Sequence, residues 1–231
     1  MSVVVRATDL SRRFGNRWAY ARLDLQVEEG ERLLIVGANG SGKTSLLRTL
    51  ATLVPASRGS LEIFGSDPVA DLASVRRRVG LLSHRPGFYE DLSGPENLEV
   101  VGRLLEREVP GDLLSRVGLE VRDDPVRQWS AGMRKRLAFA LVLLKDPDLV
   151  LLDEPYGQLD PAGMDRFTSL IAELRGTVVV ASHQVQRAAR ISDRVLLLEH
   201  GLERWAGPAD QAWPAWRALQ VESAGDEEAA P

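Results

Sequence analysis

Residues 37–44 read Gly37-Ala38-Asn39-Gly40-Ser41-Gly42-Lys43-Thr44 and come directly after the apolar run Leu33–Val36. They fit the pattern G-x-x-x-x-G-K-[ST], in which backbone N–H groups turn inward around a polyphosphate at the N-terminus of a helix. In this pattern Lys43 reaches the β- and γ-phosphates, and the Thr44 hydroxyl binds Mg²⁺. The alternative is an ordinary glycine-rich turn. The placement after an apolar strand favours a strand, a phosphate-binding loop and a helix from about residue 42 to 53.

A second strand brings carboxylates to its end. The run Leu149–Leu152 is apolar and is followed by Asp153 and Glu154. In open α/β sheets ligands bind at the carboxyl ends of the strands, so we expect these acids beside the phosphate loop. In phosphate-loop enzymes an Asp at this position holds Mg²⁺, and a neighbouring carboxylate can deprotonate the attacking water. Surface acids at the end of a strand are the alternative.

Composition limits the remaining possibilities. The 231 residues carry 29 Lys and Arg, 33 Asp and Glu, and a net charge of −4, without a basic run that would indicate a nucleic-acid or anionic membrane surface. With no Cys and three His, neither a disulfide framework nor a His metal cluster is expected. No run of 18 apolar residues and no signal-peptide pattern is present, so we expect an intracellular protein that does not span a membrane.

Residues before the phosphate loop predict two strands, 3–10 and 19–27, as an antiparallel flap. Phe14 lies between them, and its ring is either a platform for a nucleotide base or ordinary core packing. From about residue 90 to 147 only helical patterns occur, which indicates a helical insertion in an α/β domain. The last helix of the insertion begins at Ser130, a good N-cap, and Gly132 leaves its N-terminal face bare. This end is either an anion site or a plain capped helix.

Residues after Glu154 continue the alternation of strand and helix. Asp160 is predicted to cap a helix that starts at Pro161 and runs to about residue 174. The next strand, 177–181, leads to His183, which either contacts the γ-phosphate and attacking water or is a surface histidine. A hairpin and a Trp-bearing helix near 209–220 follow. We expect one domain over residues 1–220, with a helical subdomain at about 85–147, and a disordered acidic tail at 221–231.

The order and spacing of these motifs resemble the ATP-binding subunits of ABC transporters across essentially the whole chain. The resemblance implies a P-loop NTPase lobe with an antiparallel β flap, and it implies ATP and Mg²⁺ as ligands. Residues 130–133 resemble the family's LSGGQ signature, although Trp129 replaces Leu, Ala131 the first Gly and Met133 the Gln. His84 stands where the family has a metal-contacting Gln. The implied nucleotide contacts are Phe14, Gly37, Ala38, Asn39, Gly40, Ser41, Gly42, Lys43, Thr44, Ser45, Ser130 and Gly132. The implied metal contacts are Thr44, Asp153 and His84, and the implied catalytic residues are Glu154 and His183.

The resemblance also implies partners. Family members pair head to tail, so Ser130 of one subunit caps the ATP in the phosphate loop of the other, and an integral-membrane permease receives the motion at the cytoplasmic face of the membrane. The pair is a homodimer or a heterodimer with a related subunit. A soluble ABC ATPase acting on DNA or ribosomes is the alternative class, and the absence of a basic stripe and of a heptad run disfavours nucleic acid as a partner.

Residues 83–98 carry a finer resemblance. Ser83–Gly87 contains a His-x-Pro-Gly sequence, and Leu92–Leu98 reads Leu-Ser-Gly-Pro-Glu-Asn-Leu. Both resemble the haem-exporter ATP-binding subunits of cytochrome c maturation. Similar hinges in exporters of drugs, lipids or polysaccharides leave those classes open.

Overall fold

The computed structural model describes residues 2–83 and 87–218. The elements follow in chain order as β1 (Val3–Phe14), β2 (Arg17–Glu28), β3 (Arg32–Val36), α1 (Lys43–Leu50), β4 (Arg58–Ile63), α2 (Leu72–Arg78), β5 (Val79–Leu82), α3 (Gly94–Leu105), α4 (Leu113–Arg116), η1 (Val126–Gln128), α5 (Ala131–Lys145), β6 (Leu149–Asp153), α6 (Pro161–Glu173), β7 (Thr177–Ala181), α7 (Val185–Ala189), β8 (Arg194–Glu199), β9 (Leu202–Pro208) and η2 (Ala209–Gln211). A helical segment at 212–218 ends the described part.

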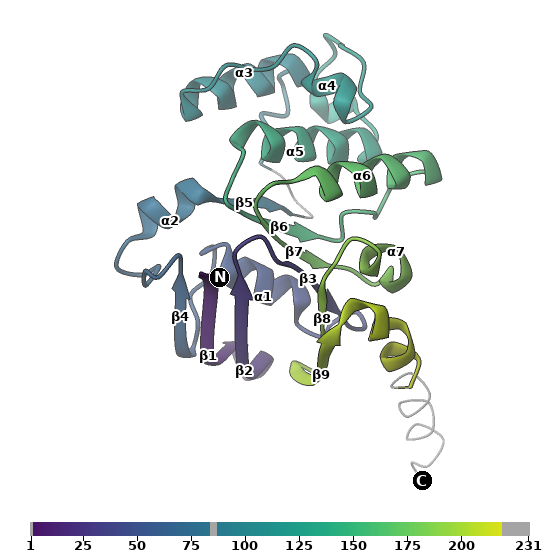
Figure 1. The fold of residues 1–231 in the computed structure, drawn as a ribbon. Helices are drawn as coiled ribbons and strands as arrows, with labels where there is room; N and C mark the ends of the chain where they lie inside the picture. Colours follow the sequence, from purple (N-terminus) through teal and green to yellow (C-terminus); the bar gives the residue numbers. More distant parts are fainter. Residues whose placement is uncertain (1, 84–86, 219–231) are drawn as a thin grey trace.

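The strand before the phosphate loop is buried on both of its faces. In β3, Leu33 and Ile35 pack into one apolar core, and Leu34 and Val36 pack into the other. Side chains of a strand alternate between the two faces of a sheet, so a continuous apolar run fills both cores at once. One core lies under the antiparallel sheet and contains the buried face of α1, and the other lies under the helices α5 and α6 (Figure 1).

The central sheet has six strands in the order β5-β6-β7-β3-β8-β9. All neighbours run parallel except β9, which pairs antiparallel with β8. In this order β7 lies between β6 and β3, with Ala181 opposite both Asp153 and Ile35. The segments that leave β3, β6 and β7 therefore start at one edge of the sheet, where the sequence predicted the ligand site.

A second sheet, of order β2-β1-β4, is antiparallel. The predicted flap is present, but its first two strands are longer than the predicted 3–10 and 19–27. Phe14 pairs with Arg17 across the two-residue turn Gly15-Asn16, so the ladder continues to the turn and Phe14 is the last residue of β1. A two-residue turn allows pairing up to its ends, which is why no separate loop precedes it.

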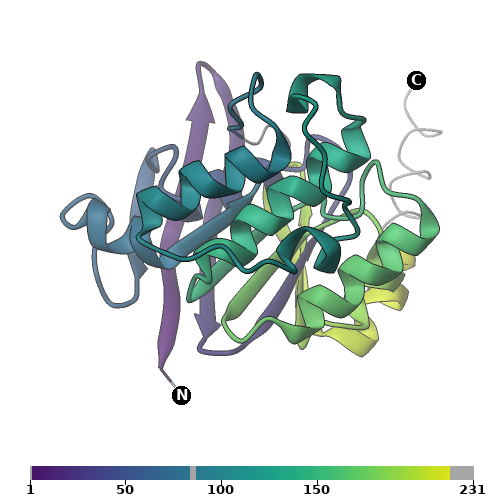
Figure 2. The same cartoon turned by 90° about the horizontal axis from the view of Figure 1, so that it is seen from above.

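The segment from α3 to α5 is helical and covers one side of the molecule. α3, α5 and α6 lie beside one another when the molecule is viewed from above (Figure 2). Trp129, two residues before α5, packs closely on the start of α3, where a Cβ on Gly94 would lie 2.3 Å from the indole ring. No helix within residues 2–83 and 87–218 is long and apolar enough to cross a membrane. The predicted tail at 221–231 lies outside the described residues.

Candidate nucleotide-binding and catalytic site

The loop between β3 and α1 depends on glycine at two points. Gly42 has a φ of +104°, and a Cβ there would lie 2.3 Å from the main-chain oxygen of Ala19. A Cβ on Gly37 would lie 2.3 Å from the oxygen of Leu198. A larger residue at either position would displace β2 or β8. Glycine therefore allows the loop to close tightly at the N-terminus of α1. This is the geometry that presents backbone N–H groups to an anion.

Lys43 lies inside the loop. Its ammonium group donates to the main-chain oxygens of Gly37 at 2.7 Å and of Ala38 at 3.0 Å. Burial lowers the pKa of Lys43, while the charges of Glu154 and Asp153 act in the opposite direction. An ammonium group has three donors, so a third can be directed to a phosphate oxygen.

Ser41 gives an independent test of whether the loop fits a polyphosphate. The hydroxyl oxygen of Ser41 is buried and has no hydrogen-bond partner among the described residues. Buried polar groups are nearly always paired, so an orphan at this position indicates a ligand with polar atoms. The Ser41 hydroxyl lies in the loop where the sequence predicted phosphate binding. The loop therefore fits a polyphosphate.

Thr44 and Asp153 form the candidate metal site. The hydroxyl of Thr44 donates to Oδ1 of Asp153 at 3.0 Å, so two predicted metal contacts that lie far apart in sequence meet in space. In the described part of the chain, no three His, Cys, Asp or Glu side chains come together as a metal site. Mg²⁺ bound with a nucleotide takes most of its ligands from phosphate and water, so one carboxylate and one hydroxyl are a suitable set. The third predicted contact, His84, lies outside the described residues.

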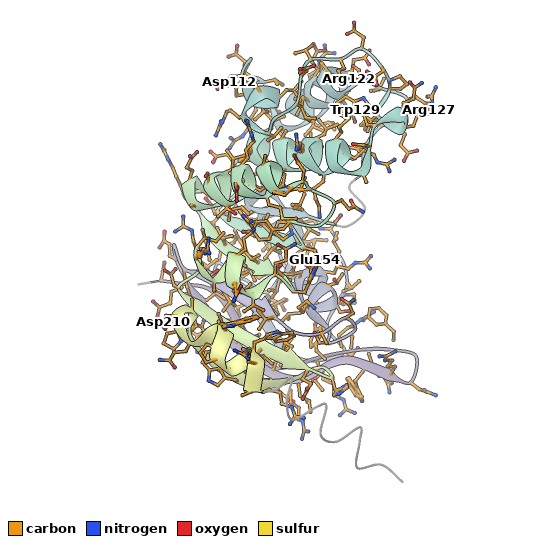
Figure 3. The ribbon with its side chains drawn as sticks, turned by 90° about the vertical axis from the view of Figure 1, so that its right-hand side faces the viewer. Asp112, Arg122, Arg127, Trp129, Glu154 and Asp210 are labelled. Atoms are coloured by element: carbon orange, nitrogen blue, oxygen red, sulfur yellow. The ribbon has the colours of Figure 1, made fainter. Side chains whose placement is uncertain are left out.

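Glu154 and His183 are in direct contact. Nδ1 of His183 lies 2.8 Å from Oε2 of Glu154, and the same oxygen accepts from the main-chain N of His183 and the hydroxyl of Ser182, both at 3.3 Å. The Glu154 side chain is 15% exposed and that of His183 is 55% exposed. Figure 3 shows Glu154 in the middle of the molecule, beneath the helical region that carries Trp129. A mostly buried carboxylate with an imidazole beside it can take a proton from water.

Most of the predicted nucleotide, metal and catalytic residues line one cleft of about 510 Å³, but Gly37, Ala38 and His183 do not line it. The cleft is lined by Phe14, Arg17, Trp18, Ala19, Asn39, Gly40, Ser41, Gly42, Lys43, Thr44, Ser45, Asp153 and Glu154. Phe14 is 48% exposed, so its ring is not part of the core. Arg17 and Trp18 were not predicted from the sequence; they reach the cleft because the tight turn after Phe14 folds β2 back beside β1. The available signal was the hairpin pattern, because a two-residue turn after Phe14 places Arg17 and Trp18 on the paired strand next to it.

Ser130 and Gly132 lie outside that cleft, at the start of α5. The Ser130 hydroxyl accepts from the main-chain N of Met133 at 3.2 Å, as predicted for an N-cap. Asp160 occupies the predicted N-cap position of α6, but the expected side-chain bond is wrong, because its carboxylate makes no cap bond and accepts from Arg136 of α5 at 2.6 Å. The strong charge of the guanidinium outcompetes neutral N–H donors for this carboxylate.

Comparison with known proteins agrees with this geometry. The family described as ABC transporter matches residues 20–157. The cytochrome c biogenesis ATP-binding export protein CcmA of Xanthomonas axonopodis pv. citri is 40% identical over 203 residues, covering 85% of this chain and 94% of the relative. The daunorubicin resistance ATP-binding protein DrrA3 of Streptomyces coeruleorubidus is 35% identical over 225 residues, covering 93% and 69%.

Solved structures show the same fold. The dimeric post-hydrolysis structure of the ATP-binding cassette MJ0796 bound to ADP and Pi has a TM-score of 0.80 and 23% identity, covering 89% of this chain and 98% of that one. The predicted fold class, a P-loop lobe with an antiparallel flap and a helical region, is confirmed.

Proposed function

Since the chain belongs to the ABC transporter family, as an ATP-binding ATPase subunit coupled to transport, we propose that it drives an exporter by hydrolysing Mg-ATP. The residues that we assign to this reaction are Lys43, Thr44, Asp153, Glu154 and His183. The observation that carries the proposal is the single cleft in which the phosphate loop, the Thr44–Asp153 contact and Glu154 meet. Polyphosphate, metal and base sites within one cleft are the parts that phosphoryl transfer to water requires.

Each residue has one role in the reaction. Water attacks the γ-phosphorus, so an oxygen–phosphorus bond forms, the bond to the β–γ bridging oxygen breaks, and the water loses a proton. Glu154 accepts that proton and His183 orients the carboxylate and the water, while Lys43 neutralises charge on the phosphates. Thr44 and Asp153 would hold Mg²⁺. When bound, the metal would offset negative charge on the phosphates.

Phe14 and Ser130 complete the nucleotide site. The half-exposed Phe14 ring carries the Arg12 guanidinium 4.6 Å from its centroid, and we assign its exposed area to the base. Ser130 and Gly132 start a helix of 15 residues, whose N-terminal positive end attracts phosphate. Because they lie outside the cleft of their own chain, they would act on ATP held by a second copy of this chain or a related subunit.

Steady-state turnover tests this function. The wild type is expected to hydrolyse ATP only with Mg²⁺. Glu154→Gln is expected to remove turnover and leave ATP binding intact, because a neutral amide accepts no proton. Glu173→Gln, the same change at an exposed position of α6, is the matched control and keeps turnover. Full turnover of Glu154→Gln would contradict the assignment of the base.

For the transported substrate, we place the chain with the haem-exporter subunits of cytochrome c maturation. The 40% identity to the cytochrome c biogenesis relative, beside 35% to the daunorubicin resistance relative, supports this choice. Deletion of the gene in its host is expected to abolish covalent c-type haem, with recovery by the wild type and none by Glu154→Gln. Normal c-type haem with altered resistance to a drug would instead assign the chain to drug export.

A permease partner is proposed for the surface around α3. This segment exposes Tyr89 by 51% and Leu104 by 71%, which are apolar side chains suited to contact another protein. The chain would then be a peripheral protein at the cytoplasmic face of the membrane. Membrane fractionation tests this: the chain is expected in the membrane fraction only when its permease is present. Membrane association without the permease would argue against this surface as the anchor.

A further inference from the structure

Lys135 is a buried cation that the mechanism above does not use. It lies on α5, just after the signature residues, and is 6% exposed. Its ammonium group donates to the main-chain oxygen of Glu154. The signature helix is therefore bonded directly to the peptide of the residue that we assign as the base.

The peptide of Glu154 is held in a conformation that costs free energy. Glu154 has a φ of +47°, a left-handed conformation that disfavours an L-residue by about 1–2 kcal/mol. Its N–H donates to the oxygen of Ala181 at 2.8 Å, and its oxygen also accepts from the N of Gly157 at 3.2 Å. The ammonium of Lys135 is thus one of the groups that fix this peptide, and with it the direction of the Glu154 side chain.

Gly157 lies beside this bond and leaves room for a small side chain. A Cβ on Gly157 would lie 3.5 Å from the Glu154 oxygen and 3.6 Å from Nζ of Lys135, in ordinary contact with both. Burial lowers the pKa of Lys135, and the charges of Asp153 and Glu154 act in the opposite direction. A buried ammonium costs free energy unless it is paired, and the Glu154 oxygen is a partner that offsets part of this cost.

We propose that Lys135 is a positioning residue that fixes the Glu154 backbone and so aims its carboxylate at the attacking water. The bond also joins the helix that begins at Ser130 to the base, so a movement of that helix is transmitted to Glu154. This inference rests on the proposed role of Glu154 and adds to it a residue of the helical region.

Lys145 provides a matched control at the other end of the same helix. Its ammonium donates to the main-chain oxygen of Arg76 at 2.7 Å, and burial lowers its pKa. Lys145→Met therefore removes the same kind of bond from the other end of the same helix, where the acceptor belongs to Arg76 and not to Glu154. The two variants should lose similar thermal stability. Any difference in turnover between them is then due to the loss of the bond to Glu154 and not to a general loss of stability.

The experiment measures kcat, the Kd for ATP and the melting temperature of each variant. Lys135→Met is expected to lower kcat by about tenfold or more, since small misplacements of a catalytic group have effects of this size, with the Kd within about twofold. Lys145→Met is expected to keep kcat within about twofold. Lys135→Arg keeps the charge and the donors and is expected to recover much of kcat. If Lys135→Met does not fold, Lys135→Gln replaces it with the same expectation, because its shorter side chain does not reach the oxygen.

A double-mutant cycle with Glu154→Gln separates positioning from general stability. If Lys135 acts through Glu154, then Lys135→Met added to Glu154→Gln leaves the residual turnover unchanged, because the group that it aims is already inactive. Two results would overturn the proposal while the role of Glu154 stands. One is an unchanged kcat in Lys135→Met. The other is that Lys135→Met lowers turnover by the same factor in the Glu154→Gln background as in the wild-type background. Full turnover of Glu154→Gln alone would instead refute the proposed base, and the positioning role with it.

Discussion

Lys43→Met removes the cation of the phosphate loop while it keeps a side chain of similar length. In the structure the ammonium group already bonds the oxygens of Gly37 and Ala38 at 2.7 and 3.0 Å, so it is fixed beside the site and little ordering is needed when phosphate binds. A hydrogen bond to a charged group contributes about 1.5–3 kcal/mol. At about 1.4 kcal/mol for each tenfold, the Kd for ATP is expected to rise by about 10- to 100-fold.

The same change has a small expected effect on folding. Two carbonyl oxygens lose their donor, but the buried ammonium, whose pKa burial lowers, no longer has to be desolvated. We expect these effects to offset, with the free energy of unfolding changed by less than about 2 kcal/mol. Urea denaturation measures this quantity, and isothermal titration with Mg-ATP measures the Kd.

Arg48→Met is the matched control, because Arg48 lies exposed on the same helix. It removes one positive charge from α1 without touching the cleft, so it is expected to leave the Kd within about twofold, as screened surface charges do. An unchanged Kd in Lys43→Met, with the protein folded, would refute the assignment of the phosphate loop.

Three further predictions concern the surroundings of the cleft. Phe14→Ala is expected to weaken ATP and GTP binding alike by about 1–3 kcal/mol in a titration, as loss of base stacking does, and unchanged affinity would exclude stacking. Gly132→Ala would place a Cβ 2.8 Å from the main-chain oxygen of Gln158, so kcat is expected to fall by about tenfold, whereas an unaltered kcat would show that the start of α5 adapts. Tyr20→Phe removes a 2.7 Å bond to Thr49 and is expected to cost about 1 kcal/mol of unfolding free energy near neutral pH. Burial raises the Tyr20 pKa from 10.0 to about 12, so the unfolded chain loses this proton first and the wild-type advantage declines from pH 10 to 12; a constant difference over that range would contradict this reasoning.

The local motifs were predictable because each depends on contiguous residues. The apolar run of β3 and the glycine spacing after it define a strand and a loop without reference to the rest of the chain. The alternation that sends Leu33 and Leu34 to opposite cores follows from strand geometry alone. The sheet edge shared by the ends of β3 and β6 followed from the parallel order of the strands.

Contacts between distant segments could not be predicted in the same way. The bond from Lys135 to Glu154 depends on how α5 lies over the end of β6, and sequence patterns do not fix that packing. For the same reason the carboxylate of Asp160, a good cap by residue type, was assigned to its own helix although Arg136 binds it. β1 and β2 extend beyond the predicted 3–10 and 19–27, because the apolar pattern that predicts a strand stops before Arg12 and Arg13 although strand pairing continues to the turn.

The most direct test of the account is size-exclusion chromatography of Glu154→Gln with and without Mg-ATP. The variant keeps the phosphate loop, Thr44 and Asp153, but its amide does not accept the proton of the attacking water. ATP would then remain bound between two chains, each of which supplies Ser130 to the nucleotide of the other. The account predicts a dimer with Mg-ATP and a monomer without it, and a variant that stays monomeric with Mg-ATP would contradict it.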